Sequence, residues 1–212
     1  MDSGISSKTT SGQPEKVAGP SDIELVKQAR DGRTEAFDAL ILRHQNRVYN
    51  TAYRMLGSRE DALDVTQEIF LTVFRRLDRF EEKARFSTWL YRVAINRCRD
   101  ELRRRSFVKH TRPQSLDAPV GADRESKIEP AAADPSPAEG AMADEAKEAV
   151  HKALARLPGE SREILVLRDL QGLGYDAVAE VLSIPIGTVR SRLSRARGLL
   201  RDRLRPILGV EP

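Results

Sequence analysis

Residues 176–205 have the sequence DAVAEVLSIPIGTVRSRLSRARGLLRDRLR, and this stretch decides the fold of the C-terminal part of the chain. Its apolar residues recur at helical spacing from Asp176 to Leu182 and from Gly187 to Arg205. Ser183-Ile184-Pro185 separates the two segments as a short turn, and the small Ala179 stands where two helices would cross closely. The stretch therefore predicts a helix-turn-helix motif.

The second helix of this motif has two chemically different sides. Its apolar residues, from Val189 to Leu204, fall on one side, which we expect to face the core. The other side, near the N-terminal end, is where a recognition helix presents side chains to base edges. Arginine can donate two hydrogen bonds to guanine, and serine or threonine can donate or accept one. The candidate DNA-contacting residues are Thr188, Arg190, Ser191, Ser194 and Arg195.

The charge of this helix supports a polyanionic partner. Seven arginines stand against the single acid Asp202 between Arg190 and Arg205. A merely solvated basic helix is the alternative, but such self-repulsion is hard to explain without an anion nearby. We therefore expect contact with DNA.

Residues 21–105 carry apolar side chains at helical spacing and lack the period-two alternation of strands. One long helix is expected to bury a stripe from Phe37 to Leu56 and to end at Gly57. Ser58 is the expected N-cap of the next helix, and Ser87 that of a further helix through the end of the region. This part is predicted to be an all-α domain.

The helix expected from Ser87 presents a second polar face. Leu90, Ala94 and Cys98 share its inward side. Asparagine can pair with adenine while arginine neutralises phosphate, so the opposite side suits nucleic acid, with a solvated face as the alternative. A tryptophan at the edge could stack on an unpaired base or close the core. The candidates for this face are Trp89, Arg92, Asn96, Arg99 and Arg103.

The helix after Ser58 carries an acidic stripe opposite its apolar side. DNA repels carboxylates, so a basic protein surface is the expected target. Acids in a first turn also favour the helix dipole, which explains Asp61 and in part Asp64 without any partner. Glu68 and its neighbour Gln67 lie too far from the start of the helix for the helix dipole to explain them. The candidate protein-binding residues are Asp61, Asp64, Gln67 and Glu68.

Two segments lack the side chains for a core. Residues 106–140 are punctuated by proline and hold almost no large apolar side chains, which predicts a linker, or else a segment that becomes ordered inside a partner. Residues 1–20 lack the apolar core of a signal peptide and are expected to form a disordered tail. The predicted fold is all-α, with two small helical domains, residues 21–105 and 141–212, joined by a flexible linker.

The composition argues against an enzyme and a cofactor. The single Cys98 excludes a disulfide framework within the chain and a cysteine-rich zinc site, and it fits a reducing cytoplasm. His44, His110 and His151 are far apart and predict no metal site. The sequence holds no glycine-rich phosphate loop or nucleophile motif, and no apolar run approaches the roughly 18 residues of a membrane span. We expect a non-catalytic cytoplasmic protein without cofactors.

Three segments, in order, resemble the extracytoplasmic-function sigma factors of bacterial RNA polymerase. Residues 61–70, DALDVTQEIF, are similar to the polymerase-clamp helix of that family. Residues 86–90, FSTWL, together with Asn96, are similar to its promoter-melting segment. Residues 187–193, GTVRSRL, resemble its upstream recognition helix.

The resemblance implies a division of labour between the domains. The N-terminal domain would bind the polymerase clamp and the minus-10 promoter element, and the C-terminal domain the polymerase flap and the minus-35 element. The resemblance also implies strand opening, with a loop at about Phe80 to Arg85 capturing a flipped base. An anti-sigma factor is a further partner that it leaves open.

Two positions depart from the family pattern. Leu63 replaces a usual acid in the clamp motif, which weakens the acidic-stripe argument slightly. Ser183 replaces a common glycine in the turn and must tolerate the backbone geometry found there.

Two other classes of protein remain as alternatives. A one-component transcriptional regulator would need a sensory domain, whereas the N-terminal half shows a basic helical face without βα alternation. A helical scaffold would leave two arginine-lined faces unexplained.

Overall fold

The computed structural model describes residues 19–111 and 147–208. Within these ranges every regular element is helical and no strand occurs. The N-terminal bundle comprises α1 (Asp22–Arg30), α2 (Thr34–Leu56), α3 (Arg59–Arg76), the short 3-10 turn η1 (Leu77–Arg79) and α4 (Phe86–Thr111). The C-terminal bundle comprises helical residues 147–155, α6 (Gly159–Leu165), the π-helical turn η2 (Val166–Leu170), α7 (Tyr175–Leu182) and α8 (Ile186–Leu208).

Local signals in the sequence set the boundaries of the first helices. Ser21 and Glu24 form a capping box at the start of α1. Gly57 ends α2 in the left-handed conformation, at φ 80°, and the Ser58 side chain accepts a hydrogen bond from the Asp61 backbone N–H. The expected stop at Gly57 and start at Ser58 are both confirmed.

The boundaries of α4 differ from the prediction. The helix begins at Phe86, and the N–H groups of Thr88 and Trp89 donate to the carbonyl of Arg85, so Ser87 lies inside the first turn and is not the cap. At its other end α4 continues through Thr111, beyond the residue where the linker was expected to begin. The predicted linker from residue 112 onward lies outside the described residues, as does the tail up to residue 18.

The C-terminal bundle contains the predicted helix-turn-helix. Ser183, at the turn between α7 and α8, adopts φ 56° and ψ 47°, the left-handed conformation that usually favours glycine. Val189, Leu193 and Ala196 bury the inner side of α8, as expected. Ser183 therefore has a strained backbone at the position where the family that the sequence resembles commonly has glycine.

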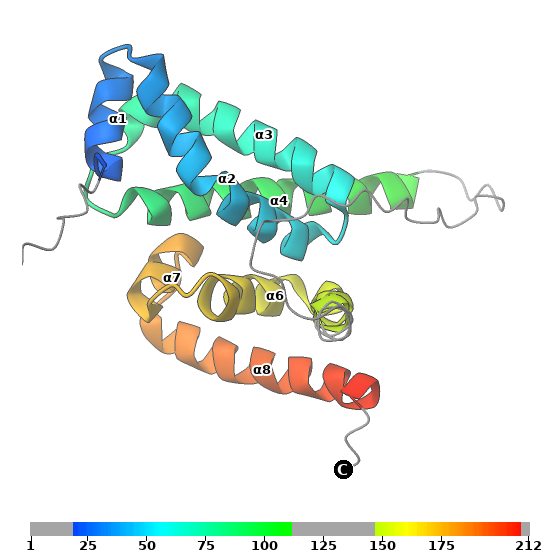
Figure 1. The fold of residues 1–212 in the computed structure, drawn as a ribbon. Helices are drawn as coiled ribbons and strands as arrows, with labels where there is room; N and C mark the ends of the chain where they lie inside the picture. The colour runs from blue at the N-terminus through cyan, green and yellow to red at the C-terminus, as the bar shows by residue number, and fades with distance from the viewer. Residues whose placement is uncertain (1–18, 112–146, 209–212) are drawn as a thin grey trace, which may run out of the picture.

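The two bundles pack against each other, which the sequence did not predict. In Figure 1, α6 and α7 lie between α4 above them and α8 below, and contacts join α4 to α7 and α2 to α6. The buried residues of both bundles belong to one connected apolar cluster. The prediction of an all-α chain with two helical regions is confirmed, and the described regions are in direct contact.

Candidate nucleic-acid and polymerase interfaces

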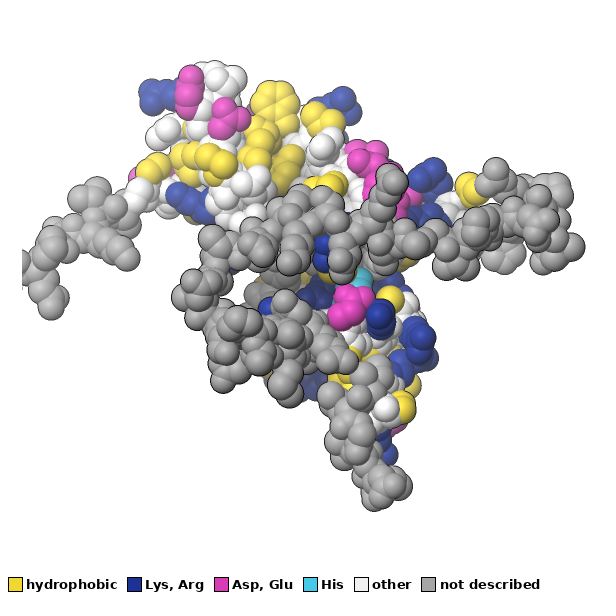
Figure 2. All heavy atoms as spheres, turned by 45° about the vertical axis from the view of Figure 1, so that its right-hand side comes forward, with side chains coloured by type: hydrophobic (Ala, Val, Ile, Leu, Met, Phe, Trp, Pro, Cys, Tyr) yellow, Lys and Arg dark blue, Asp and Glu magenta, His cyan; other side chains and the backbone are white. Residues whose placement is uncertain are grey.

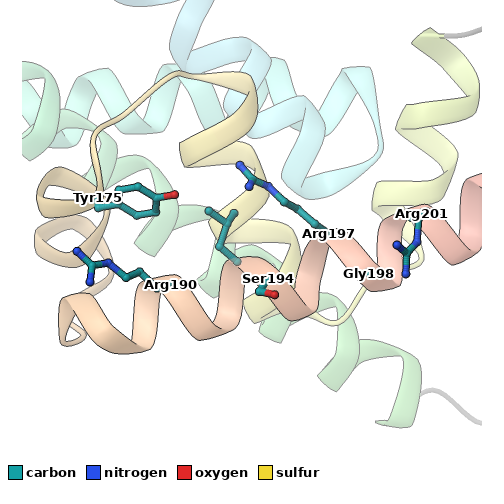
Figure 3. A pocket seen from close by; sticks show the side chains of 7 residues that line it. Tyr175, Arg190, Ser194, Arg197, Gly198 and Arg201 are labelled. Atoms are coloured by element: carbon teal, nitrogen blue, oxygen red, sulfur yellow. The ribbon is translucent and has the colours of Figure 1, made fainter.

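The outer face of α8 brings most of the minus-35 candidates together. Arg190, Ser191, Ser194 and Arg195 are exposed, while Thr188 is half-buried and its carbonyl accepts a hydrogen bond of 3.2 Å from the Ser191 hydroxyl. Arg190 and Ser194 line a hollow of about 650 Å³, and Figure 3 shows Tyr175 of α7 on the far side of it from α8. The hollow continues along α8 past Arg197, Gly198 and Arg201.

Several arginines of α8 lie close to acidic side chains, so the repulsion among these arginines is weaker than the sequence suggested. Arg197 forms a two-pronged contact with Asp169, at 2.9 and 2.6 Å, and this raises the pKa of the guanidinium. Arg192 lies 3.2 Å from Glu160, and Arg201 is 3.7 Å from Asp202. Arg190 and Arg195 remain exposed at the N-terminal half of the helix. The sequence analysis missed Tyr175 and Arg197 because neither belongs to the set of outward residues that the helical pattern identified on α8.

Two of the minus-10 candidates on α4, Arg92 and Arg99, bind groups of the C-terminal bundle. Arg99 donates to both carboxylate oxygens of Glu163 at 2.6 Å, and this bonding raises the arginine's pKa. Arg92 donates to the Glu180 carbonyl at 2.7 Å. Asn96 is exposed beside them, with its Oδ1 3.4 Å from an Arg99 nitrogen. The three residues thus form one surface, but two of them are engaged within the chain.

Two other minus-10 candidates lie apart from that surface. Trp89 packs in an aromatic cluster, with ring centroids 5.4 Å from Phe80 and 5.9 Å from Phe86, which favours a core-closing role. Arg103 is exposed and pairs with Asp100 at 2.5 Å. The indole is half-buried, so an edge of it remains accessible to solvent.

The loop between η1 and α4 is anchored from α1. Arg30 donates to the carbonyl of Leu77 at 2.9 and 3.1 Å and to that of Phe80. Glu82 lies 3.4 Å from both Arg30 and Lys27 and adopts φ 54°. Base capture was expected for this loop, and that role stays a prediction. Nothing in the sequence indicated the residues in α1 that anchor the loop.

The acidic stripe on α3 is engaged by arginines of α4. Arg105 binds Asp61 at 2.6 Å, and Arg97 binds Glu68. Asp64 and Gln67 are exposed. The stripe is therefore partly neutralised, and the free acidic surface that the sequence suggested is smaller than expected.

An apolar groove lies beside Gln67 between α2 and α3. Leu71 and Phe74 are 54% and 55% exposed, although both are large and apolar. Figure 2 shows hydrophobic side chains gathered on the N-terminal bundle, in its upper part. The groove has a volume of about 410 Å³ and is lined by Phe37, Ile41, Gln45, Thr66, Gln67, Phe70, Leu71 and Phe74. Exposed patches of this kind mark interaction surfaces. Leu71 and Phe74 fall outside the inward stripe of α3, a signal that the sequence analysis missed.

The described residues show no group of histidine, cysteine and acidic side chains able to hold a metal, and none of their helices is long and apolar enough to cross a membrane. Cys98 is fully buried, and burial raises the pKa of its thiol to about 12, which disfavours the thiolate that reactive cysteines use.

Comparison with known proteins identifies the family. Residues 40–108 match the model for Sigma-70 region 2, and residues 147–200 match that for Sigma-70, region 4. The RNA polymerase sigma-H factor of Pseudomonas aeruginosa is 35% identical over 188 residues, which cover 88% of this chain and 95% of that protein. The ECF RNA polymerase sigma-E factor of Escherichia coli K12, where ECF stands for extracytoplasmic function, is 33% identical over 191 residues, which cover 89% of this chain and 96% of that protein. The chain belongs to the extracytoplasmic-function sigma factors.

Solved structures agree with this assignment. CnrH, from its complex with the cytosolic domain of CnrY, matches with a TM-score of 0.61 at 26% identity, covering 87% of this chain and 96% of that one. The sigma factor RpoE of Bartonella quintana, solved with the anti-sigma factor NepR, shares the fold with a TM-score of 0.60, covering 80% and 96%. The protein is an RNA polymerase sigma factor that binds core polymerase and promoter DNA, and the one-component regulator is not favoured. Sigma factors as a class are non-catalytic initiation factors.

Proposed function

We propose that this sigma factor divides its binding surfaces between the bundles. The outer face of α8, with Thr188, Arg190, Ser191, Ser194 and Arg195, reads the minus-35 element. The face of α4 with Arg92, Asn96 and Arg99, together with Arg103, the edge of Trp89 and the loop before α4, binds and melts the minus-10 element. Neither role involves catalysis or a cofactor.

The observation that carries the minus-35 assignment is the exposure of Arg190, Ser194 and Arg195 on one side of a helix-turn-helix. Side chains of these types match the donor and acceptor pattern of the major groove. The basic hollow that continues past Arg197 and Arg201 suits the phosphate backbone beside the bases that are read.

We assign the clamp contact to α3, through Asp61, Asp64, Gln67 and Glu68, and extend it to the apolar groove. Gln67 belongs to both surfaces. An apolar centre with a polar and acidic rim is the arrangement found in specific protein interfaces. CnrH was solved with the cytosolic domain of another protein, which supports a protein partner besides the polymerase for this chain as well.

The assignment of sigma activity is tested by reconstitution. Purified chain is added to bacterial core polymerase with a pool of fragments from the genome that encodes it, and the transcripts are sequenced. We expect start sites that share two upstream sequence elements and that depend on the added chain. Transcription without common start sites would contradict a role in promoter recognition.

The clamp assignment is tested by a matched pair of variants. Phe74→Asp places a charge in the groove, whereas Leu42→Asp makes the same change at a side chain 69% exposed and outside it. We expect Phe74→Asp alone to abolish capture by core polymerase. Reversal of Glu68 is a poorer test, because it also breaks the contact with Arg97. Equal capture of both folded variants would remove the groove from the interface.

A further inference from the structure

The path of the loop between η1 and α4 is set by one arginine of α1. Arg30 Nε and Nη2 both donate to the carbonyl of Leu77, at 3.1 and 2.9 Å, and Nη2 also donates to the carbonyl of Phe80. Nη1 lies 3.4 Å from a carboxylate oxygen of Glu82. The donors of a guanidinium point in fixed directions, so these contacts fix the direction of the loop as well as its distance from α1.

Glu82 is the point at which the middle of the loop meets α1. Its carboxylate lies 3.4 Å from Lys27 Nζ as well as from Arg30, so both cationic side chains of α1 contact this one acid. The residue has φ 54°, in the left-handed region that glutamate seldom adopts. The contacts with α1 therefore hold the backbone in a conformation that the loop by itself would rarely adopt.

α1 is firmly attached to the rest of the bundle. The Asp22 carboxylate accepts a hydrogen bond from Arg43 of α2 at 2.6 Å, and its other oxygen lies 2.9 Å from His44 Nε2. Leu25 and Val26 are buried in the core. A loop that is bound to α1 is therefore bound to the rigid part of the bundle.

The ends of the loop are buried, and residues between them reach solvent. Phe80 and Phe86 are 3% and 2% exposed, and their ring centroids are 5.7 Å apart. The exposed residues between them are Glu81, Lys83 and Arg85. The directions of these side chains follow the backbone path, and that path depends on Arg30.

We propose that Arg30 is a positioning residue for promoter opening, which holds this loop in the shape that receives an unpaired base of the minus-10 strand. The inference rests on the proposed role of the loop in binding the minus-10 element. The guanidinium is directed at the loop and acts on DNA only through it. Without the anchor the loop is in the competent shape for a fraction of the time, and the affinity for the strand falls by that fraction.

Arg30→Gln tests the proposal, with Arg33→Gln as the matched control. Both changes remove one positive charge, but Arg33 is exposed at the start of α2 and takes no part in the contacts with the loop. Arg30→Lys keeps the charge beside Glu82 and lacks the planar set of donors, so it should give an intermediate result. We expect all three variants to fold and to be captured by core polymerase like the original chain.

The first measurement follows the loop in the chain without DNA. Trp89 is the single tryptophan, and its ring centroid is 5.4 Å from that of Phe80 at the start of the loop. Release of the loop should open this contact and admit a small quencher such as acrylamide. We expect a larger quenching constant in Arg30→Gln and an unchanged constant in Arg33→Gln.

The second measurement compares an intact minus-10 strand with strands that lack one base. Polymerase reconstituted with each variant is mixed with a fluorescent single-stranded oligonucleotide from a promoter found by reconstitution, and each position in turn is made abasic. In the original chain we expect the loss of one particular base to weaken binding about fivefold or more. In Arg30→Gln the intact strand should bind about as weakly as that abasic strand binds the original chain, and loss of the same base should have no further effect.

The abasic series separates positioning from general stability. A variant that is only less stable loses affinity for every strand to the same extent and keeps the penalty for the missing base. If Arg30→Gln does not fold, Arg30→Lys provides the test, and a reduced penalty is expected there.

Three outcomes would overturn the proposal, and they are distinguishable. Unchanged quenching in folded Arg30→Gln would show that Arg30 does not fix the loop. Increased quenching with the full abasic penalty would show that the shape of the loop does not matter for the base. No penalty at any position in the original chain would show that the loop captures no base, which refutes its proposed role together with the inference.

Discussion

Glu101 offers a sharp test of how the arginines of α4 are held. Its carboxylate accepts hydrogen bonds from Arg104 at 2.9 and 2.7 Å and from Arg105 at 3.0 Å, and its side chain is 5% exposed. Arg104 and then Arg105 hold the pKa of Glu101 at about 2, against an ordinary value of 4.5. The charged form is therefore favoured in the folded chain.

The lowered pKa of Glu101 sets the expected contribution of this carboxylate to stability. At about 1.4 kcal/mol for each pKa unit, the lowering corresponds to roughly 3 kcal/mol of folding free energy at neutral pH. Arg104 is largely exposed, and solvent screening reduces the expected loss in Glu101→Gln to about 2 kcal/mol. Because the folded pKa is lowered, the contribution is fully present above the ordinary pKa of 4.5 and disappears as the pH falls through about 2.

Urea unfolding followed by circular dichroism at about pH 7 and about pH 3 measures both the size and the sign of the effect. We expect the difference between the original chain and Glu101→Gln to shrink to about 1 kcal/mol or less at the lower pH. Glu60→Gln, at an exposed position on α3, should change stability by no more than about 0.5 kcal/mol. A difference below 0.5 kcal/mol at neutral pH, or one that does not vary with pH, would refute the reasoning.

Other predictions concern the DNA surfaces and the turn. Arg190→Ala and Arg195→Ala should each cost about 1–3 kcal/mol in minus-35 binding and relax base discrimination; equal weakening on every upstream sequence in a binding assay would make them phosphate contacts. Asn96→Ala should impair promoter opening, followed by permanganate reactivity of thymines, more than polymerase capture, and normal opening would count against the α4 face. Ser183→Gly should raise the unfolding free energy by about 0.5–1 kcal/mol by relieving the left-handed strain, whereas an unchanged or lower urea midpoint would show that the serine is not strained.

Periodicity and capping chemistry predicted most of the fold. The stop at Gly57 and the start at Ser58 depend on local backbone geometry, so neighbouring residues were enough to predict them. Ser87 was misplaced because a serine inside the first turn and a serine at the cap have the same local signature, and the carbonyl of Arg85 takes up the N–H groups instead. Helix ends without a distinctive cap are the boundaries that a sequence leaves least determined.

The sequence predicted the candidate binding surfaces less completely than it predicted the fold. A helical wheel identifies which side chains point outward, and on α8 the outward arginines are exposed as expected. The same method cannot show that Arg99 meets Glu163 or that Arg105 meets Asp61, because each pair is far apart in the sequence and depends on how helices pack. The apolar groove was missed for a related reason, since its residues come from both α2 and α3.

The distribution of partners among the arginines gives the two proposed DNA surfaces different electrostatic properties. On α4, Arg92 and Arg99 bind groups of the C-terminal bundle, so their fields are largely cancelled while the bundles are packed. On α8, Arg190 and Arg195 are exposed in the N-terminal half of the helix. Uncancelled exposed charge attracts DNA over about a Debye length, whereas a paired guanidinium acts only on contact. Salt should therefore weaken the first binding of DNA to α8 more steeply than the later binding of the minus-10 strand to α4. Before they bind that strand, Arg92 and Arg99 must exchange one anionic partner for another.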